Sequence, residues 1–240
     1  MRTFDELVAG LKDLKKQGFV KTHRAGNTGI GKTLEDLLGI EENNFAGPDG
    51  ETTELKAGRK NAASMLTLFT KSPQPPKINS VLLNELGYPD KEGSTKKILH
   101  TTINANTYNT LKGGAGLKIA VKEDRIEIDS PKLKHNPDIP TPYWDKSTLQ
   151  ERFEKKYQEL LYVKADSRGS GKDEEFHFNE AWIMKGFDFE NFVKLLREST
   201  LLVDIRIGQY PDGRPHDHGT GFRIMPDRLD QCFSDRKKVL

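Results

Sequence analysis

Apolar residues follow a helical period over the first 17 residues of the chain. Phe4, Leu7, Val8, Leu11 and Leu14 fall on one stripe, while charged residues occupy the remaining positions. This spacing predicts an amphipathic helix that packs on a core. The same reasoning predicts further helices at Lys32–Leu38, Asn79–Leu86, Ser147–Gln158 and Phe189–Leu196, with Pro226 opening a last one.

Short β-branched or apolar runs bounded by turn residues predict the strands. They lie at Thr52–Lys56, Met65–Thr70, Leu160–Ala165, Glu175–Phe178, Leu201–Ile207 and Gly221–Ile224, and Leu117–Val121 with Arg125–Ile128 is expected to form a hairpin. A polar region rich in Thr and Asn precedes that hairpin, from residue 97. The Pro-rich stretch from Ser130 to Trp144 is the best linker candidate. This mixture of elements indicates an α/β or α+β fold.

Composition narrows the class of protein. The 240 residues suffice for one large domain or two lobes, and 34% hydrophobic content argues against wholesale disorder. No apolar run reaches the roughly 20 residues of a membrane helix, and the N-terminus lacks a signal-peptide core. A single cysteine, Cys232, excludes an internal disulfide and a cysteine-based zinc site. We therefore expect a cytoplasmic protein.

The distribution of charge is more informative than the net value of +2. Residues 57–84 and 93–122 contain no acidic side chain but carry nine lysines and arginines. Such a separation fits a face that binds a polyanion, because cations that neutralise phosphates gain from counterion release. Two solvated faces that lack acids by chance are the alternative.

The segment PDGETTELK carries the first candidate chemistry, a D-x4-E-x-K pattern. A turn delivers Asp49, and Glu54 and Lys56 share one face of the following strand while Leu55 points into the core. Two carboxylates and the Leu55 carbonyl can hold Mg²⁺ beside a phosphodiester. The lysine can orient or deprotonate a water molecule. A charged edge strand with a salt bridge is the structural alternative.

The segment Gly26–Thr33, GNTGIGKT, satisfies the P-loop pattern and supports a rival function, nucleoside triphosphate hydrolysis. A P-loop must follow a buried strand, yet only Phe19 and Val20 are apolar before Lys21–Arg24. A magnesium-binding aspartate would have to come from Leu201–Asp204 or from the strand ending in Asp166. The helix that must follow a P-loop is plausible here, but the buried strand that must precede it is not.

The run from Val203 to Ile224 alternates charged and apolar residues on a strand and then adds a histidine-containing loop. Arginine, aspartate and histidine side chains are the groups that read base edges in a major groove. The candidates for DNA contact are Asp204, Arg206, His216, Asp217, His218 and Arg223. A structural loop with pH-sensitive histidines remains an alternative.

Taken together, these segments resemble the MvaI/BcnI family of type II restriction endonucleases, which are similar in fold to the nicking enzyme MutH. The resemblance covers most of the chain and rests on the order and spacing of four blocks. They are Gly26–Leu38, Pro48–Lys56, Leu66–Pro73 and the pair VDIRIG and HDHGTGFRI within Val203–Ile224. In this light the P-loop match is a coincidence.

The resemblance implies a restriction-endonuclease-like α/β fold of the PD-(D/E)xK type, with a mixed sheet flanked by helices. Two lobes would clamp duplex DNA, a catalytic lobe at residues 1–95 and a recognition lobe at residues 96–240, although C-terminal strands could return to the first lobe. Asp49 and Glu54 would bind Mg²⁺, Lys56 would assist the water, and Glu35 would support the site. Thr70 and Lys71 join the candidates for DNA contact.

The resemblance also implies a monomer that nicks one strand per binding event within a CCNGG-like site. The BcnI-like members carry histidine where Thr70 and Gly221 stand here, so the chain looks MvaI-like and an A·T centre (CCWGG) is expected. A cognate DNA methyltransferase is the expected companion. A non-catalytic DNA-binding module is the other rival function.

Overall fold

The computed structural model describes residues 2–40, 49–111, 114 and 116–240. They form two compact units, each assembled from separate stretches of sequence. The first contains residues 1–66, 153–188 and 225–240, and the second contains residues 67–152 and 189–224. This division does not coincide with a single boundary between residues 95 and 96. The catalytic and recognition roles of the units stay predictions.

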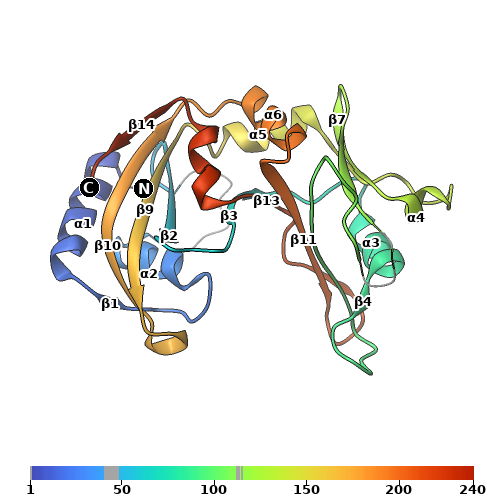
Figure 1. Ribbon diagram of the computed structural model, residues 1–240, viewed down its shortest axis with the longest axis horizontal. Helices are drawn as coiled ribbons and strands as arrows, with labels where there is room; N and C mark the ends of the chain where they lie inside the picture. Colours follow the sequence, from blue (N-terminus) through green and yellow to red (C-terminus); the bar gives the residue numbers. More distant parts are fainter. Residues whose placement is uncertain (1, 41–48, 112–113, 115) are drawn as a thin grey trace. The chain divides into compact units, whose positions relative to one another are not determined.

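The first unit is built on a five-stranded mixed sheet in the order β1-β10-β9-β2, with β14 paired to β10 (Figure 1). Strand β2 runs parallel to β9, and β10 is antiparallel to β9, β1 and β14. The strands are β1 (Val20–Lys21), β2 (Thr53–Arg59), β9 (Glu159–Arg168), β10 (Glu175–Lys185) and β14 (Asp235–Lys238). The β2–β9 pairing explains why residues far beyond 95 belong to this unit.

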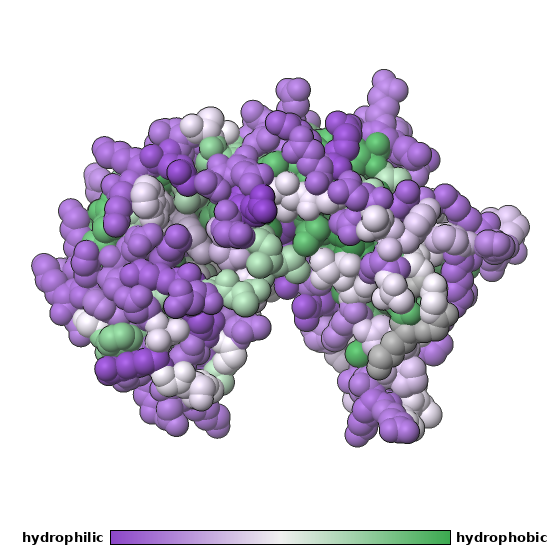
Figure 2. Space-filling model, in the orientation of Figure 1, coloured by the Kyte–Doolittle hydropathy of each residue, from purple (hydrophilic) through white to green (hydrophobic). Residues whose placement is uncertain are grey.

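Two helices cover one face of this sheet, α1 (Phe4–Gln17) and α2 (Gly29–Leu37). Leu7, Leu11 and Leu14 of α1 are buried, as the apolar stripe predicts. They pack with α2 and with every second residue of the strands, Leu55 among them. Thr3 and Glu6 form a capping box that fixes the start of α1. Hydrophilic residues predominate on the visible face of this unit (Figure 2).

The helix expected to open at Pro226 is present as a 3-10 helix, η2 (Pro226–Cys232). A second 3-10 helix, η1 (Gly171–Asp173), precedes β10. Beside the sheet, Phe153, Tyr157, Phe187 and Phe233 form an aromatic cluster with neighbouring ring centroids 4.8–6.5 Å apart. This cluster holds the chain that enters β9.

The second unit contains a six-stranded sheet in the order β3-β13-β11-β5-β4, with β12 paired to β11, and a three-stranded sheet β6-β7-β8. Its strands are β3 (Leu66–Thr70), β4 (Tyr88–Pro89), β5 (Lys97–Ile103), β6 (Lys118–Val121), β7 (Arg125–Asp129), β8 (Tyr143–Asp145), β11 (Leu201–Gln209), β12 (Pro215–Asp217) and β13 (Gly221–Ile224). Its helices are α3 (Ile78–Leu86), α4 (Pro131–Lys134), α6 (Phe189–Arg197) and α5 (Lys146–Glu154), of which the last two residues are counted in the first unit. The predicted β6–β7 hairpin is confirmed.

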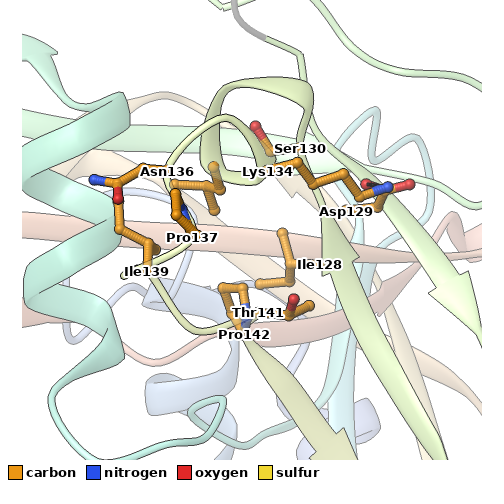
Figure 3. Close-up of a pocket in the computed structure, with 10 residues that line it drawn as sticks. Ile128, Asp129, Ser130, Lys134, Asn136, Pro137, Ile139, Thr141 and Pro142 are labelled. Atoms are coloured by element: carbon orange, nitrogen blue, oxygen red, sulfur yellow. Dashed lines mark ion pairs between the residues drawn. The ribbon is translucent and has the colours of Figure 1, made fainter.

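One strand of this region was not predicted, and one expectation is wrong. The polar stretch at 97–120 contains β5, which pairs with β11 in the middle of the sheet. The Pro-rich stretch Ser130–Trp144 does not link the two units, because it lies within the second one. It carries α4 and β8 and lines an open pocket of about 260 Å³ together with Ile128 and Asp129 (Figure 3). The expected turn at Pro48 lies partly outside the described residues.

No helix in the described part of the chain combines the length and the apolar character that crossing a membrane requires.

Candidate functional site

The turn before β2 carries Asp49, and two hydrogen bonds fix it to the strand. The Gly50 N–H donates to the Thr53 carbonyl at 2.8 Å. The Leu55 N–H donates to Oδ2 of Asp49 at 2.9 Å. The carboxylate of Asp49 therefore stays beside the strand that carries the other candidates.

Alternation along β2 places Glu54 and Lys56 on the face opposite the helices. Leu55 points the other way and is 3% exposed within the helix-covered core. Glu54 is completely buried, and its Oε1 lies 2.6 Å from the Nζ of Lys56. The expected shared face is therefore present, with the two side chains in direct contact.

A second lysine reaches the same carboxylate from the turn before β9. The Nζ of Lys156 lies 3.0 Å from Oε1 and 3.1 Å from Oε2 of Glu54. Local sequence patterns gave no sign of this contact, because Lys156 follows Glu54 by 102 residues. Only the parallel pairing of β2 with β9 brings them together.

The charges around Lys56 act on its pKa. Burial lowers the pKa of Lys56, but Glu54, by charge and hydrogen bond, and then Asp49 and Glu35 outweigh this effect, so the pKa is raised. Lys56 is therefore an ammonium ion in the metal-free protein. The pKa of Tyr157 is raised well above its usual value by burial and then by Glu54, which places this phenol near the same carboxylates.

The rival P-loop hypothesis does not fit the structure. Strand β1 has two residues and, among the described residues, pairs with the first residues of β10. Helix α2 begins at Gly29, before the lysine of the motif. A Cβ on Gly29 would lie 2.0 Å from the Arg24 carbonyl oxygen, so close packing explains this glycine.

The polar residues of the P-loop pattern also have internal partners. Lys32 pairs with Asp36 at 2.8 Å across one helical turn. The buried Thr33 hydroxyl donates to the Gly29 carbonyl at 2.7 Å and accepts the His23 N–H at 2.9 Å. These contacts give the segment a structural role.

In the second unit, Asp204 organises two of the arginines expected to contact DNA. Its carboxylate is 2.6 Å from Nε of Arg206 and 3.1 Å from a guanidinium nitrogen of Arg223. Thr102 donates a third hydrogen bond at 2.9 Å. Asp204 is 2% exposed, whereas the Arg206 side chain is 45% exposed. The acid therefore fixes two cations on one face of the sheet.

The expected histidines lie along the same sheet. His216 pairs with Gly208 across β11 and β12, and the His218 N–H donates to the Arg206 carbonyl at 2.9 Å. The two imidazole rings are 4.1 Å apart, and Tyr210 stacks on His216 at 4.4 Å. Tyr210 is 44% exposed beside these histidines. It was not among the residues predicted to contact DNA.

Asp217 has a different environment from its histidine neighbours. Its carboxylate accepts hydrogen bonds from Ser72, Asn79 and the Gly219 N–H at 2.6, 2.6 and 2.8 Å. These bonds tie β12 to the residues around α3. The arrangement favours an anchoring role for Asp217 over direct base contact.

Thr70 and Lys71 follow β3 in the same unit. The Lys71 N–H donates to the Thr220 carbonyl at 3.0 Å, and its own carbonyl accepts the Trp144 indole N–H at 2.8 Å. Thr70 is exposed beside Gly219, where an added Cβ would lie 3.2 Å from its methyl group. The backbone of this segment is thus held in place.

The donor chemistry around Glu54 fits a hard divalent cation. Among the described residues, no group of three or more His, Cys, Asp or Glu side chains forms a metal site. Asp49 and Glu54 supply two carboxylates, and the Asp49 carboxylate accepts the N–H of Leu55, the residue that follows Glu54. Carboxylate and carbonyl oxygens are the ligands that Mg²⁺ prefers.

A comparison with known protein families shows to which family the chain belongs. The family model of the MvaI/BcnI restriction endonuclease family matches residues 8–233. The chain belongs to the MvaI/BcnI restriction endonuclease family. It is therefore a type II restriction endonuclease with a restriction-endonuclease-like fold, as the sequence motifs imply.

Two solved structures are similar over the full length of both chains. One is the complex of restriction endonuclease MvaI with its cognate DNA substrate, at 32% identity and a TM-score of 0.85. The other is MvaI in the absence of DNA, at 29% identity and a TM-score of 0.60. None of the curated proteins matches the chain. Restriction endonucleases of this kind generally use a divalent metal.

Proposed function

We propose that this restriction endonuclease hydrolyses both strands of a CCNGG-like DNA site in a Mg²⁺-dependent reaction, leaving 5′-phosphate and 3′-hydroxyl ends. The observation that carries the proposal is the contact of Glu54 with Lys56 beside Asp49, on the sheet face opposite the helices. A phosphodiester needs charge neutralisation and a positioned water molecule, and this group supplies both.

Asp49, Glu54 and the Leu55 carbonyl are the residues that would hold Mg²⁺. The ion, when bound, supplies a Lewis acid that offsets the charge of the scissile phosphate. The Leu55 N–H holds the Asp49 carboxylate in its orientation. The Glu54 carboxylate keeps its orientation because this residue of β2 is completely buried. The strand therefore fixes both carboxylates before substrate arrives, which lowers the cost of ordering them.

Lys56 acts as a cation and hydrogen-bond donor in this proposal. Its raised pKa keeps the amine protonated in the metal-free protein, so it orients the attacking water and stabilises negative charge in the transition state. Glu35 supports the site through its charge, which acts on Lys56.

The second unit supplies the groups that read DNA. Arg206 and Arg223 can donate hydrogen bonds to guanine edges in a major groove. Asp204 fixes the position of both guanidinium groups by ion pairs. His216 lies on β12 and His218 directly follows this strand. Lys71 contacts the DNA backbone, and Asp217 anchors the loop. Thr70 and Gly221 stand near the central base pair, for which we propose A·T (CCWGG).

The proposed enzyme is a cytoplasmic monomer. One active site cuts one strand per binding event, so the molecule must rebind in the opposite orientation to cut the second strand. A DNA methyltransferase of the same specificity would protect the host genome. These statements rest on the family resemblance and on the one catalytic cluster found in the described part of the chain.

Digestion of a sequenced plasmid tests the proposal. Purified protein with Mg²⁺ should first produce nicked circles and then linear DNA, and sequencing of the ends should return CCWGG sites. Arg206→Ala should abolish site-specific cutting, whereas Arg214→Ala, which changes an exposed arginine paired with Asp212, should not. Cutting at unrelated sequences would refute the assigned specificity, and DNA binding without any cutting would favour a decayed, non-catalytic module.

A further inference from the structure

The buried carboxylate of Glu54 contacts two lysine side chains, although one catalytic lysine was expected at this site. Lys156 contacts both of its oxygens, and Lys56 contacts Oε1. Glu54 is completely buried, so no bulk water replaces these partners. Both oxygens of this carboxylate are therefore in contact with an ammonium group.

The backbone around Lys156 is firmly placed. The Lys156 and Tyr157 N–H groups both donate to the Phe153 carbonyl at 2.9 Å. The Tyr157 ring is buried in the aromatic cluster, 5.4 Å from Phe153 and 5.5 Å from Phe187. The ammonium group, in contrast, ends a flexible four-carbon stem and can leave the carboxylate without moving the backbone.

The formal charges explain why the contact between Lys156 and Glu54 should break when a divalent cation binds. Glu35, Asp49 and Glu54 carry three negative charges, and the two lysines carry two positive charges. A divalent cation on Glu54 would turn this small negative excess into a positive one. An ammonium group about 3 Å from the same oxygens would strongly repel an ion bound at about 2.1 Å.

We propose that Lys156 is a positioning residue that acts as an exchangeable counter-ion: it holds Glu54 in the metal-free enzyme and withdraws when a divalent cation binds. The inference rests on the proposed role of Glu54 as a metal ligand. Lys156 thereby keeps the buried acid in its place without metal and weakens metal binding in return. The released ammonium is then free to face the DNA phosphate.

Direct measurement of Mg²⁺ binding without DNA tests the idea. Calorimetric titration of the full chain should show that Lys156→Met binds Mg²⁺ about tenfold more tightly than the wild type, because a competing cation is gone. Lys155→Met removes the exposed neighbouring charge and is the matched control, with unchanged affinity. In EDTA, Lys156→Met should also melt at a lower temperature than the control, since Glu54 loses a partner.

Two further variants keep the test decisive. Lys156→Gln retains a hydrogen-bond donor and should fold where methionine does not, again with tighter Mg²⁺ binding. Asp49→Asn should lose Mg²⁺ binding; if it does not, the proposed metal site itself is wrong. If Asp49→Asn loses binding while Lys156→Met and Lys156→Gln bind Mg²⁺ no more tightly than the wild type, the counter-ion role alone is refuted.

Discussion

The carboxylate of Asp49 accepts the N–H of Leu55 at 2.9 Å, so the acid that precedes β2 is tied to the residue between Glu54 and Lys56. This bond joins the turn to the strand in one rigid piece. It also separates two functions of Asp49, since one oxygen supports the backbone and the carboxylate charge is available to a cation.

Asp49→Asn should therefore lose activity without losing the fold. The amide retains an oxygen that can accept the Leu55 N–H, so the melting temperature should change little. Loss of the negative charge should lower the cleavage rate by about 100-fold or more. Thermal melting and plasmid cleavage measure the two effects separately. Unchanged cleavage by the folded variant would show that Asp49 is no metal ligand.

Removal of the Asp204 carboxylate should destabilise the second unit. Asp204→Ala leaves two guanidinium groups without their buried partner, and we expect a loss of about 2 kcal/mol in the free energy of unfolding, reduced by the exposure of Arg206.

A smaller change at Thr102 provides the comparison. Thr102→Val removes one neutral donor to Asp204 and should cost about 1 kcal/mol. Urea unfolding of both variants gives the values. Equal stability of Asp204→Ala and the wild type would show that the network does not support the fold.

The single thiol should be inert in the folded protein. Cys232 is completely buried, and burial, with a smaller effect of Asp230, raises the pKa of its thiol to about 12. Since the thiolate is the reactive form, a disulfide reagent at pH 8 should react about 1,000-fold more slowly with native than with unfolded protein. Similar rates with and without urea would mean that the η2 segment opens readily.

Local sequence patterns predicted the part of the site that lies on one strand. Alternation in β2 was enough to place Glu54 and Lys56 on a shared face, with Leu55 in the core. The same reasoning failed for Lys156, because its contact with Glu54 depends on which distant strand lies beside β2. Hydrophobic periodicity does not specify the neighbours of a strand.

The errors in the fold have similar physical causes. Strand β5 was missed because His100 and Thr102 lie on its polar face, where Thr102 bonds to Asp204. Proline in Ser130–Trp144 suggested a linker, yet these residues fold against their own unit. The glycines of the P-loop pattern were ambiguous until close packing at Gly29 explained one of them.

The most direct test of the central claim is the Mg²⁺-dependent cleavage rate of plasmid DNA by Lys56→Met, compared with the wild type at equal DNA occupancy. Methionine keeps an unbranched side chain of similar length, one atom shorter, but removes the charge that contacts Glu54. The wild type should cut with Mg²⁺ and not with EDTA, and the folded variant should bind DNA but cut at least about 100-fold more slowly. A variant that cuts at the wild-type rate would show that the Lys56 ammonium group plays no part in catalysis.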